Sequence, residues 1–343
     1  MGIFDFWRSR EKQLDDERVS EELVREATDL VVKIANPRLN LVRRYRERLA
    51  PAVECSIHFL RKMNDSLPAA HEATAAGWAA DPCIHAFFAR PDDVVRAFSR
   101  SNEVRSFFER APEQQEAFTL LGMAMTEQKV LGMQMQGEVI HRDVPQTTVS
   151  FSDYKMRVCG RTELELRRDL GRRLFEQFGV QALGRISAIQ SVRRELEDKR
   201  ALLKARLRLL QSQGAGLDAV FGDSAPAGDE KLRSVESQLE ENERQLGESG
   251  SGADALDHEL ECVIDVLNNP GKGLVVTPRH LRLTSMNVIV EGQSSEPFQE
   301  VDFHVAEIAS DPPMTRAFTL VRFPRADLLP SDFLMREAER YLG

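Results

Sequence analysis

Two cysteine–histidine pairs carry the residue types best suited to binding a metal ion. Cys55 and His58 lie three residues apart in the stretch CSIH, and Cys83 and His85 lie two apart in CIH. Residues three apart share one face of a helix, so the two pairs can together form a two-cysteine, two-histidine set of the kind that binds zinc. The long separation between the pairs and the Cys-x-His spacing are both unusual for such a site. We therefore prefer buried thiols with hydrogen-bonded histidines and keep zinc as the alternative.

The stretch RRDLGRR is a second candidate site, since it groups four arginines within two turns of a predicted helix: Arg167, Arg168, Arg172 and Arg173. Such a cluster can contact the phosphates of a nucleic acid or of an anionic membrane. Acidic residues surround it and can neutralise it through salt bridges: Glu163, Glu165, Asp169 and Glu176. We prefer the salt-bridged interpretation and keep anion binding as the alternative.

No residues with a recognisable catalytic spacing occur in the sequence. Four methionines share one predicted helix, where thioethers can bind Cu(I) but more often form core or an interaction surface: Met123, Met125, Met133 and Met135. The stretch NNPGKG lacks the spacing of a phosphate-binding P-loop. We therefore predict a non-catalytic protein without catalytic residues or a cofactor. A metal-binding protein or enzyme with its site in the N-terminal helical domain is an alternative.

The composition limits the class of protein and its location. A net charge of −9 argues against a chain that coats nucleic acid along its whole surface. No apolar run reaches the roughly 20 residues that span a bilayer, and the N-terminus is apolar first and charged afterwards, unlike a secretory signal. We expect a cytoplasmic protein with reduced cysteines. The N-terminus either packs onto the core or contacts a membrane surface peripherally, in both cases through Phe4, Phe6 and Trp7.

Apolar periodicity predicts the elements that position these residues. Residues 1–142 show helical spacing with repeated start signals, such as Ser20 before Leu23 and the prolines Pro82 and Pro91, so we expect an all-helical domain. The last predicted helix of this domain carries Leu120, Leu121 and the four methionines.

Alternation of apolar and polar residues begins near Pro145 and returns after residue 270. A hairpin turning near Ser152 and Asp153, followed by strands through Val301, Phe303 and Phe318, predicts an antiparallel β-rich domain of residues 145–160 plus 270–325. Residues 161–268 interrupt it as a helical hairpin with a tip at about 212–229, and 326–343 form a C-terminal helix. The expected fold class is α+β, predominantly helical, with a long inserted antiparallel coiled-coil hairpin.

The two arms of the predicted hairpin carry opposite charge. Leucines recur every seven residues on both arms, at Leu196, Leu203 and Leu210 and at Leu232, Leu239 and Leu246. Residues 161–213 contain 13 basic and 7 acidic side chains, whereas residues 229–265 contain 3 and 12. Opposite charge favours pairing the arms with each other. We predict an interaction or scaffold protein whose projecting arm binds a protein partner or a second copy, with a nucleic-acid or anionic-membrane accessory protein as the alternative.

Overall fold

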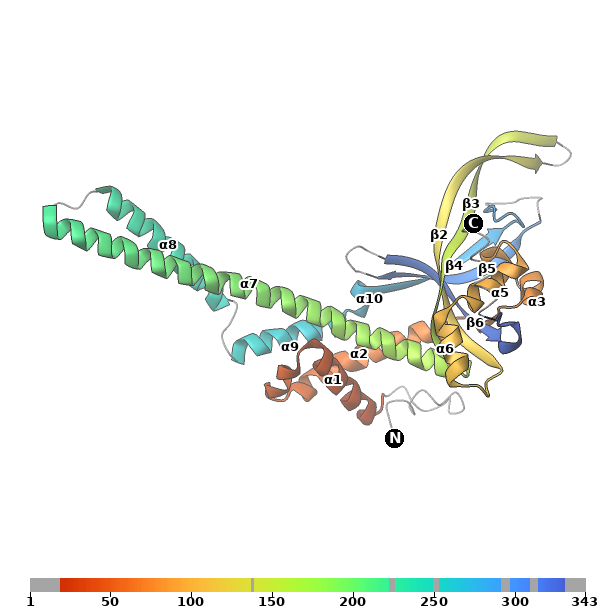
Figure 1. Cartoon of the computed structure of the whole chain (residues 1–343), viewed down its shortest axis with the longest axis horizontal. Coiled ribbons are helices and arrows are strands. Elements are labelled where there is room, and N and C mark those ends of the chain that lie inside the picture. The colour runs from red at the N-terminus through yellow and green to blue at the C-terminus, as the bar shows by residue number, and fades with distance from the viewer. Residues whose placement is uncertain are drawn as a thin grey trace. The chain divides into compact units, whose positions relative to one another are not determined.

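The computed structural model describes residues 19–136, 139–221, 226–248, 253–290, 297–308 and 314–330 (Figure 1). These residues form two compact units. The sheet unit takes its residues from Ile57–Phe175 and Pro270–Gly343, and the helical unit takes its residues from Arg18–Ser56 and Glu176–Asn269. Two of the boundaries between them fall inside helices, α2 (Tyr45–Ser66) and α7 (Glu163–Phe221).

The sheet unit is built on six strands, which confirms the predicted α+β class. The antiparallel strands lie in the order β3 (Val139–Gly160), β2 (Glu116–Gln136), β6 (Met314–Pro324), β5 (Gln299–Ile308) and β4 (Leu274–Leu283). The two-residue strand β1 (His71–Glu72) pairs with β6 in parallel, off this path. The long helix α7 follows β3, so the helical insertion between the first and last strands is also confirmed.

The prediction of a helix over Leu120–Met135 is wrong, because these residues form strand β2. Along its first half, Ala117, Thr119, Leu121 and Met123 are fully buried on one face of the sheet. The residues between them, Phe118 and Leu120, pack against a second core on the other face. A strand buried on both faces has no apolar–polar alternation, and its Leu and Met residues are also good helix formers. The run of helices in the predicted all-helical domain of residues 1–142 therefore ends at Arg110, and its residues from Ile57 onward belong to the sheet unit.

The β2–β3 hairpin runs out beyond the other strands (Figure 1), since β2 pairs with β6 only over Glu116–Met123. The pairing of β2 with β3 shifts register at three places. Opposite these places lie Val158, Asp153 and Asp143, which all have positive φ. Such bulges increase the local twist of a strand pair. The predicted turn near Ser152 and Asp153 is thus a bulge inside one strand.

Four short helices cover one face of the sheet: α3 (Ala75–Ala80), α4 (Pro82–Phe87), α5 (Pro91–Ser99) and α6 (Asn102–Arg110). Their starts are encoded locally, because Thr74, Asp81 and Ser101 accept backbone N–H groups as N-caps, and Pro82 and Pro91 occupy first turns. Their phenylalanines fill the main core. On the other face, Leu166 and Leu170 of α7 form a smaller core with Leu67 and Leu320.

The helical unit contains α1 (Glu21–Ala35), the 3-10 helix η2 (Pro37–Leu41), α8 (Pro226–Glu248) and α9 (Ala253–Asn268), together with parts of α2 and α7. Ser20 caps α1 as predicted, accepting the N–H of Leu23. Gly179 brings α7 close to α1, since an added Cβ would lie 3.0 Å from Ile34 Cγ2. Arg48 on α2 pairs with Asp257 and Glu261 on α9.

Basic residues of α7 meet acidic residues of the returning helices at two described places, as predicted. Lys204 lies 2.9 Å from Glu243 on α8, and Arg185 lies 2.6 Å from Asp265 on α9. Figure 1 shows α8 doubling back beside α7. The predicted tip of about 212–229 is too long, because α7 continues to Phe221 and α8 begins at Pro226.

The remaining short elements are α10 (Pro270–Gly273) and the 3-10 helix η3 (Arg325–Asp327), both in the sheet unit. The predicted C-terminal helix, 326–343, falls mostly outside the described residues. Phe4, Phe6 and Trp7 also lie outside them. Among the described helices, none combines the length and apolar character that crossing a bilayer requires.

Candidate functional site

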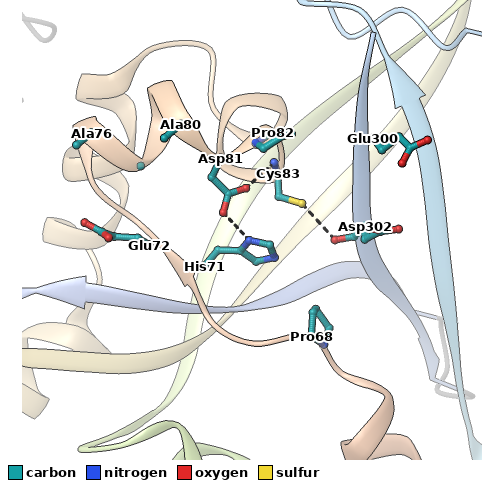
Figure 2. Close-up of a pocket in the computed structure, with 11 residues that line it drawn as sticks. Pro68, His71, Glu72, Ala76, Ala80, Asp81, Pro82, Cys83, Glu300 and Asp302 are labelled. Carbon is teal, nitrogen blue, oxygen red and sulfur yellow. Dashed lines mark hydrogen bonds and ion pairs between the residues drawn. The ribbon is translucent and has the colours of Figure 1, made fainter.

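A cavity of about 610 Å³ in the sheet unit gathers several side chains with metal-binding or acid–base chemistry. Its walls come from β1, from α3 and the start of α4, and from β5 (Figure 2). His71 on β1 and Asp81 and Cys83 at the start of α4 lie together, with ligand atoms within 4.8 Å of one another. The lining also includes the acidic residues Glu72, Glu300 and Asp302.

A short hydrogen bond joins His71 and Asp81. The Nδ1–H of His71 donates to Asp81 Oδ2 over 2.6 Å, while Asp81 Oδ1 accepts the N–H of Cys83 at 2.8 Å. Asp81 thus both caps α4 and fixes the orientation of the imidazole. The other ring nitrogen, Nε2, is buried and has no hydrogen-bond partner among the described residues.

The electrostatics of this pair follow from burial opposed by hydrogen bonding. Burial lowers the pKa of His71, but the hydrogen bond to Asp81 and the neighbouring Cys83 outweigh it and raise the pKa to about 10. Burial raises the pKa of Asp81, yet its bonds to His71 and to the backbone of α4 have the larger combined effect, so the pKa is lowered. Asp81 therefore carries its negative charge at neutral pH.

Cys83 is buried and lines the cavity. Its thiol donates to the backbone carbonyl oxygen of Asp302 over 3.3 Å (Figure 2). The carboxylate of Asp302 instead accepts from His280 Nδ1 at 2.7 Å, on the neighbouring strand β4. The Cys83 thiol thus donates a weak hydrogen bond to a backbone carbonyl and lies beside an imidazole that Asp81 holds in place.

The structure places the predicted zinc ligands in different surroundings. Cys83 belongs to the cluster just described, whereas His85 stacks on Trp78 with ring centroids 4.3 Å apart. Cys55 is exposed and belongs to the helical unit, and His58 lies on the part of α2 in the sheet unit. Only Cys83 of the predicted set lies in the cluster, and the set of Cys55, His58, Cys83 and His85 stays a prediction.

The arginine cluster is partly structural. The guanidinium of Arg167 donates to Glu163 and to three carbonyl oxygens at the end of α2, those of Asn64 in its last turn and of Leu67 and Pro68 just after it. Its side chain is only 14% exposed. Arg168 is half-buried, and Arg172 and Arg173 are exposed on α7. Arg167 is therefore occupied by the fold, and anion binding by the four arginines stays a prediction. Of the four predicted methionines, Met123 is core.

Sequence reasoning missed His71 and Asp81 as partners of Cys83. The pairing of β1 with β6 places His71 beside Val321, 250 residues away in the chain. No local spacing encodes such a contact. The one available signal was the order Asp81–Pro82–Cys83, which marks a capped helix start and puts the thiol next to the capping carboxylate.

Comparisons with protein-family models, with curated proteins and with solved structures find no match to this chain. Its function has to be argued from its own residues.

A second buried histidine, His304 on β5, gives a stability prediction. Both of its ring nitrogens are buried without a hydrogen-bond partner among the described residues, and burial lowers its pKa, against the opposing effect of Asp302. The unfolded chain binds a proton near the ordinary pKa of 6.5, while the folded chain resists it. Stability should therefore fall as the pH drops below about 6.5 towards the lowered folded pKa.

Replacing His304 by leucine should stabilise the fold by about 1 kcal/mol at neutral pH, since it removes an unpaired polar group. It should also remove the part of the fall in stability at acid pH that protonation of His304 causes. Urea unfolding at about pH 7.5 and about pH 5.5 measures both effects. The same comparison for His280→Gln, an exposed histidine on β4, should leave the loss due to His304 in place. If wild type and His304→Leu lose the same stability between the two pH values, His304 is not the source of the acid sensitivity.

Proposed function

We propose that the chain is a non-catalytic interaction protein that binds a protein partner through its helical arm, defined as residues 176–221 of α7 together with α8. The observation that supports it is a pair of leucines on α7, Leu202 and Leu209, which are 69% and 63% exposed. They lie seven residues apart with the exposed Ala205 between them, and so share one helical face. Large apolar side chains grouped on an exposed face are typical of interaction surfaces.

This face lies beside the side of α7 that faces α8. Leu203, one residue or about 100° further round the helix, is buried, as is Val235 on α8. Leu196 and Leu210 on α7 and Leu239 on α8 are partly buried. These residues support the proposal that α7 and α8 form a two-helix coiled coil with Leu202 and Leu209 left outside its seam.

The surroundings of the exposed leucines favour an acidic partner. Lys199, Arg206 and Arg208 are exposed on the same stretch of α7. The chain already shows the matching chemistry, because the acidic helix α8 meets α7 through Lys204 and Glu243. An amphipathic helix with acidic residues beside an apolar stripe is therefore the proposed partner. The four cysteines are unpaired, and a reducing, cytoplasmic location is part of this proposal.

The double substitution Leu202→Ser and Leu209→Ser should remove partner binding without lowering the thermal midpoint, because both side chains are largely exposed. Leu41→Ser on η2 is the matched control, as Leu41 is 72% exposed outside the arm. Cross-linking and affinity capture from the native host would compare the three proteins. Loss of the same captured protein in the double variant alone supports the proposal.

Two results would contradict it. The first is an unchanged set of captured proteins for the double variant. The second is binding of anionic vesicles or nucleic acid that falls steeply with salt and is lost when Arg172 and Arg173 are changed to glutamine. That result would make the chain an accessory protein of anionic surfaces.

A further inference from the structure

The cluster of His71, Asp81 and Cys83 has no role in the proposed partner binding. Among the described residues it is the one group of three or more potential metal ligands with atoms close enough to share an ion. We propose that the cavity binds a divalent transition-metal ion, zinc by preference, through His71 Nε2 and Cys83 Sγ, with Asp81 holding the imidazole in position. Water would fill the remaining coordination positions.

The ligand types select this class of ion. A thiolate and an imidazole bind zinc and cobalt(II) well, whereas calcium and magnesium prefer oxygen ligands throughout. Metal-binding histidines usually donate a hydrogen bond from their other ring nitrogen to a carboxylate or carbonyl group. The carboxylate of Asp81 is that acceptor for His71. The 2.6 Å bond from Nδ1 fixes the orientation of the ring, and an ion would bind Nε2 in place of the proton that this nitrogen carries while the imidazole is protonated. That nitrogen is buried and has no other partner among the described residues.

The charge around the cavity also favours a cation. Glu72, Asp81, Glu300 and Asp302 line it, and among the described lining residues none is lysine or arginine. Arg322 pairs with Glu72, and His280 pairs with both Asp302 and Glu300, so three of these charges are partly compensated. Asp81 remains next to the proposed ligands, where its negative charge stabilises a dication.

The same three residue types can also form a nucleophilic Cys–His–Asp triad, and the local geometry argues against that role. A thiol that attacks a carbonyl needs nearby N–H donors for the oxyanion. The N–H of Cys83 is already taken by Asp81 Oδ1. The nearby carboxylates of Glu300 and Asp302 would repel a developing negative charge. These features suit a bound cation better than an anionic intermediate.

Cobalt(II) titration of the metal-free, full-length protein tests the site, since a cobalt–thiolate bond produces a charge-transfer absorption. We expect one cobalt per chain, displaced by an equivalent of zinc. His71→Ala and Cys83→Ala should abolish the absorption. Asp81→Asn should weaken binding by about 10–100-fold while keeping both ligands, as is typical for outer supporting residues.

Cys55→Ala is the matched control, because Cys55 is exposed and belongs to the alternative four-residue set. It should leave the titration unchanged. If Cys55→Ala abolishes binding while His71→Ala does not, the metal uses the set predicted from sequence spacing and the present proposal is overturned.

Alkylation of wild-type protein gives a second readout that does not depend on the folding of any variant. Peptide mass spectrometry should show that zinc protects Cys83 from iodoacetamide and leaves Cys55 equally reactive. Absence of the cobalt–thiolate absorption, or alkylation of Cys83 at the same rate with and without zinc, overturns the proposal. Rapid, metal-independent alkylation of Cys83 would support the nucleophilic role instead.

Discussion

Replacing Phe87 by alanine will destabilise the sheet unit by about 3–5 kcal/mol, the range for truncating a buried phenylalanine. Its ring is 2% exposed on α4 and makes edge-to-face contacts with Phe151 on β3 and Phe303 on β5. The two partner rings also contact each other, with centroids 5.6 Å apart. The substitution therefore leaves a cavity where a helix and two strands meet. Urea unfolding followed by circular dichroism measures the loss.

The same change should reach the candidate metal site, because Phe87 anchors the short helix that begins beside Cys83. We expect cobalt affinity to fall in Phe87→Ala, and Phe87→Leu to recover most of the lost stability by refilling the space. A Phe87→Ala protein with the wild-type unfolding midpoint would show that the aromatic cluster contributes little to stability.

Replacing Arg167 by alanine will cost about 2–4 kcal/mol, because it leaves buried carbonyl groups without their charged donor. Arg167 joins the root of α7 to three carbonyl oxygens at the end of α2, with N···O distances of 2.6 to 3.1 Å. Lysine keeps the charge but cannot reproduce the planar, multiple contact, so Arg167→Lys should recover only part of the loss. Thermal or urea unfolding measures it.

Arg161→Ala is the control, since Arg161 is exposed and its guanidinium lies 3.9 Å from Glu113. It should change stability by less than about 0.5 kcal/mol. Similar losses of stability in Arg161→Ala and Arg167→Ala would show that removing a positive charge near α7 causes the loss. The hydrogen bonds from Arg167 to the carbonyl oxygens would then not account for it.

Local signals in the sequence predicted most helix starts and the late strands. Ser20, Asp81 with Pro82, and Pro91 each mark a helix beginning through a hydrogen bond or a fixed φ that involves only neighbouring residues. Val301, Phe303 and Val305 alternate because they point to one core, and β5 follows that pattern. The opposite charges of α7 and the returning helices also predicted which segments meet.

Features that depend on distant partners could not be predicted in this way. Strand β2 has apolar residues on both faces because a core lies on each side of the sheet, and this hides its alternation. The candidate metal site shows the same difficulty. Cys83 was identified by its type, but His71 reaches it only through the pairing of β1 with β6. The positive φ values at Asp143, Asp153 and Val158 could not be predicted either, because none of these residues is a glycine.

Strand β6 has a consequence for biosynthesis. It pairs with β1, β2 and β5, and it is the last strand among the described residues, about 150 residues after the end of β3. At about 5–20 residues per second, translation of that interval takes roughly 8–30 s. Throughout it, the apolar side chains of β2 and the edge that β6 will cover lack their partner. The ribosome makes the charged helices of the insertion during this delay, so the nascent sheet unit must be kept from associating with other chains until its final strand emerges.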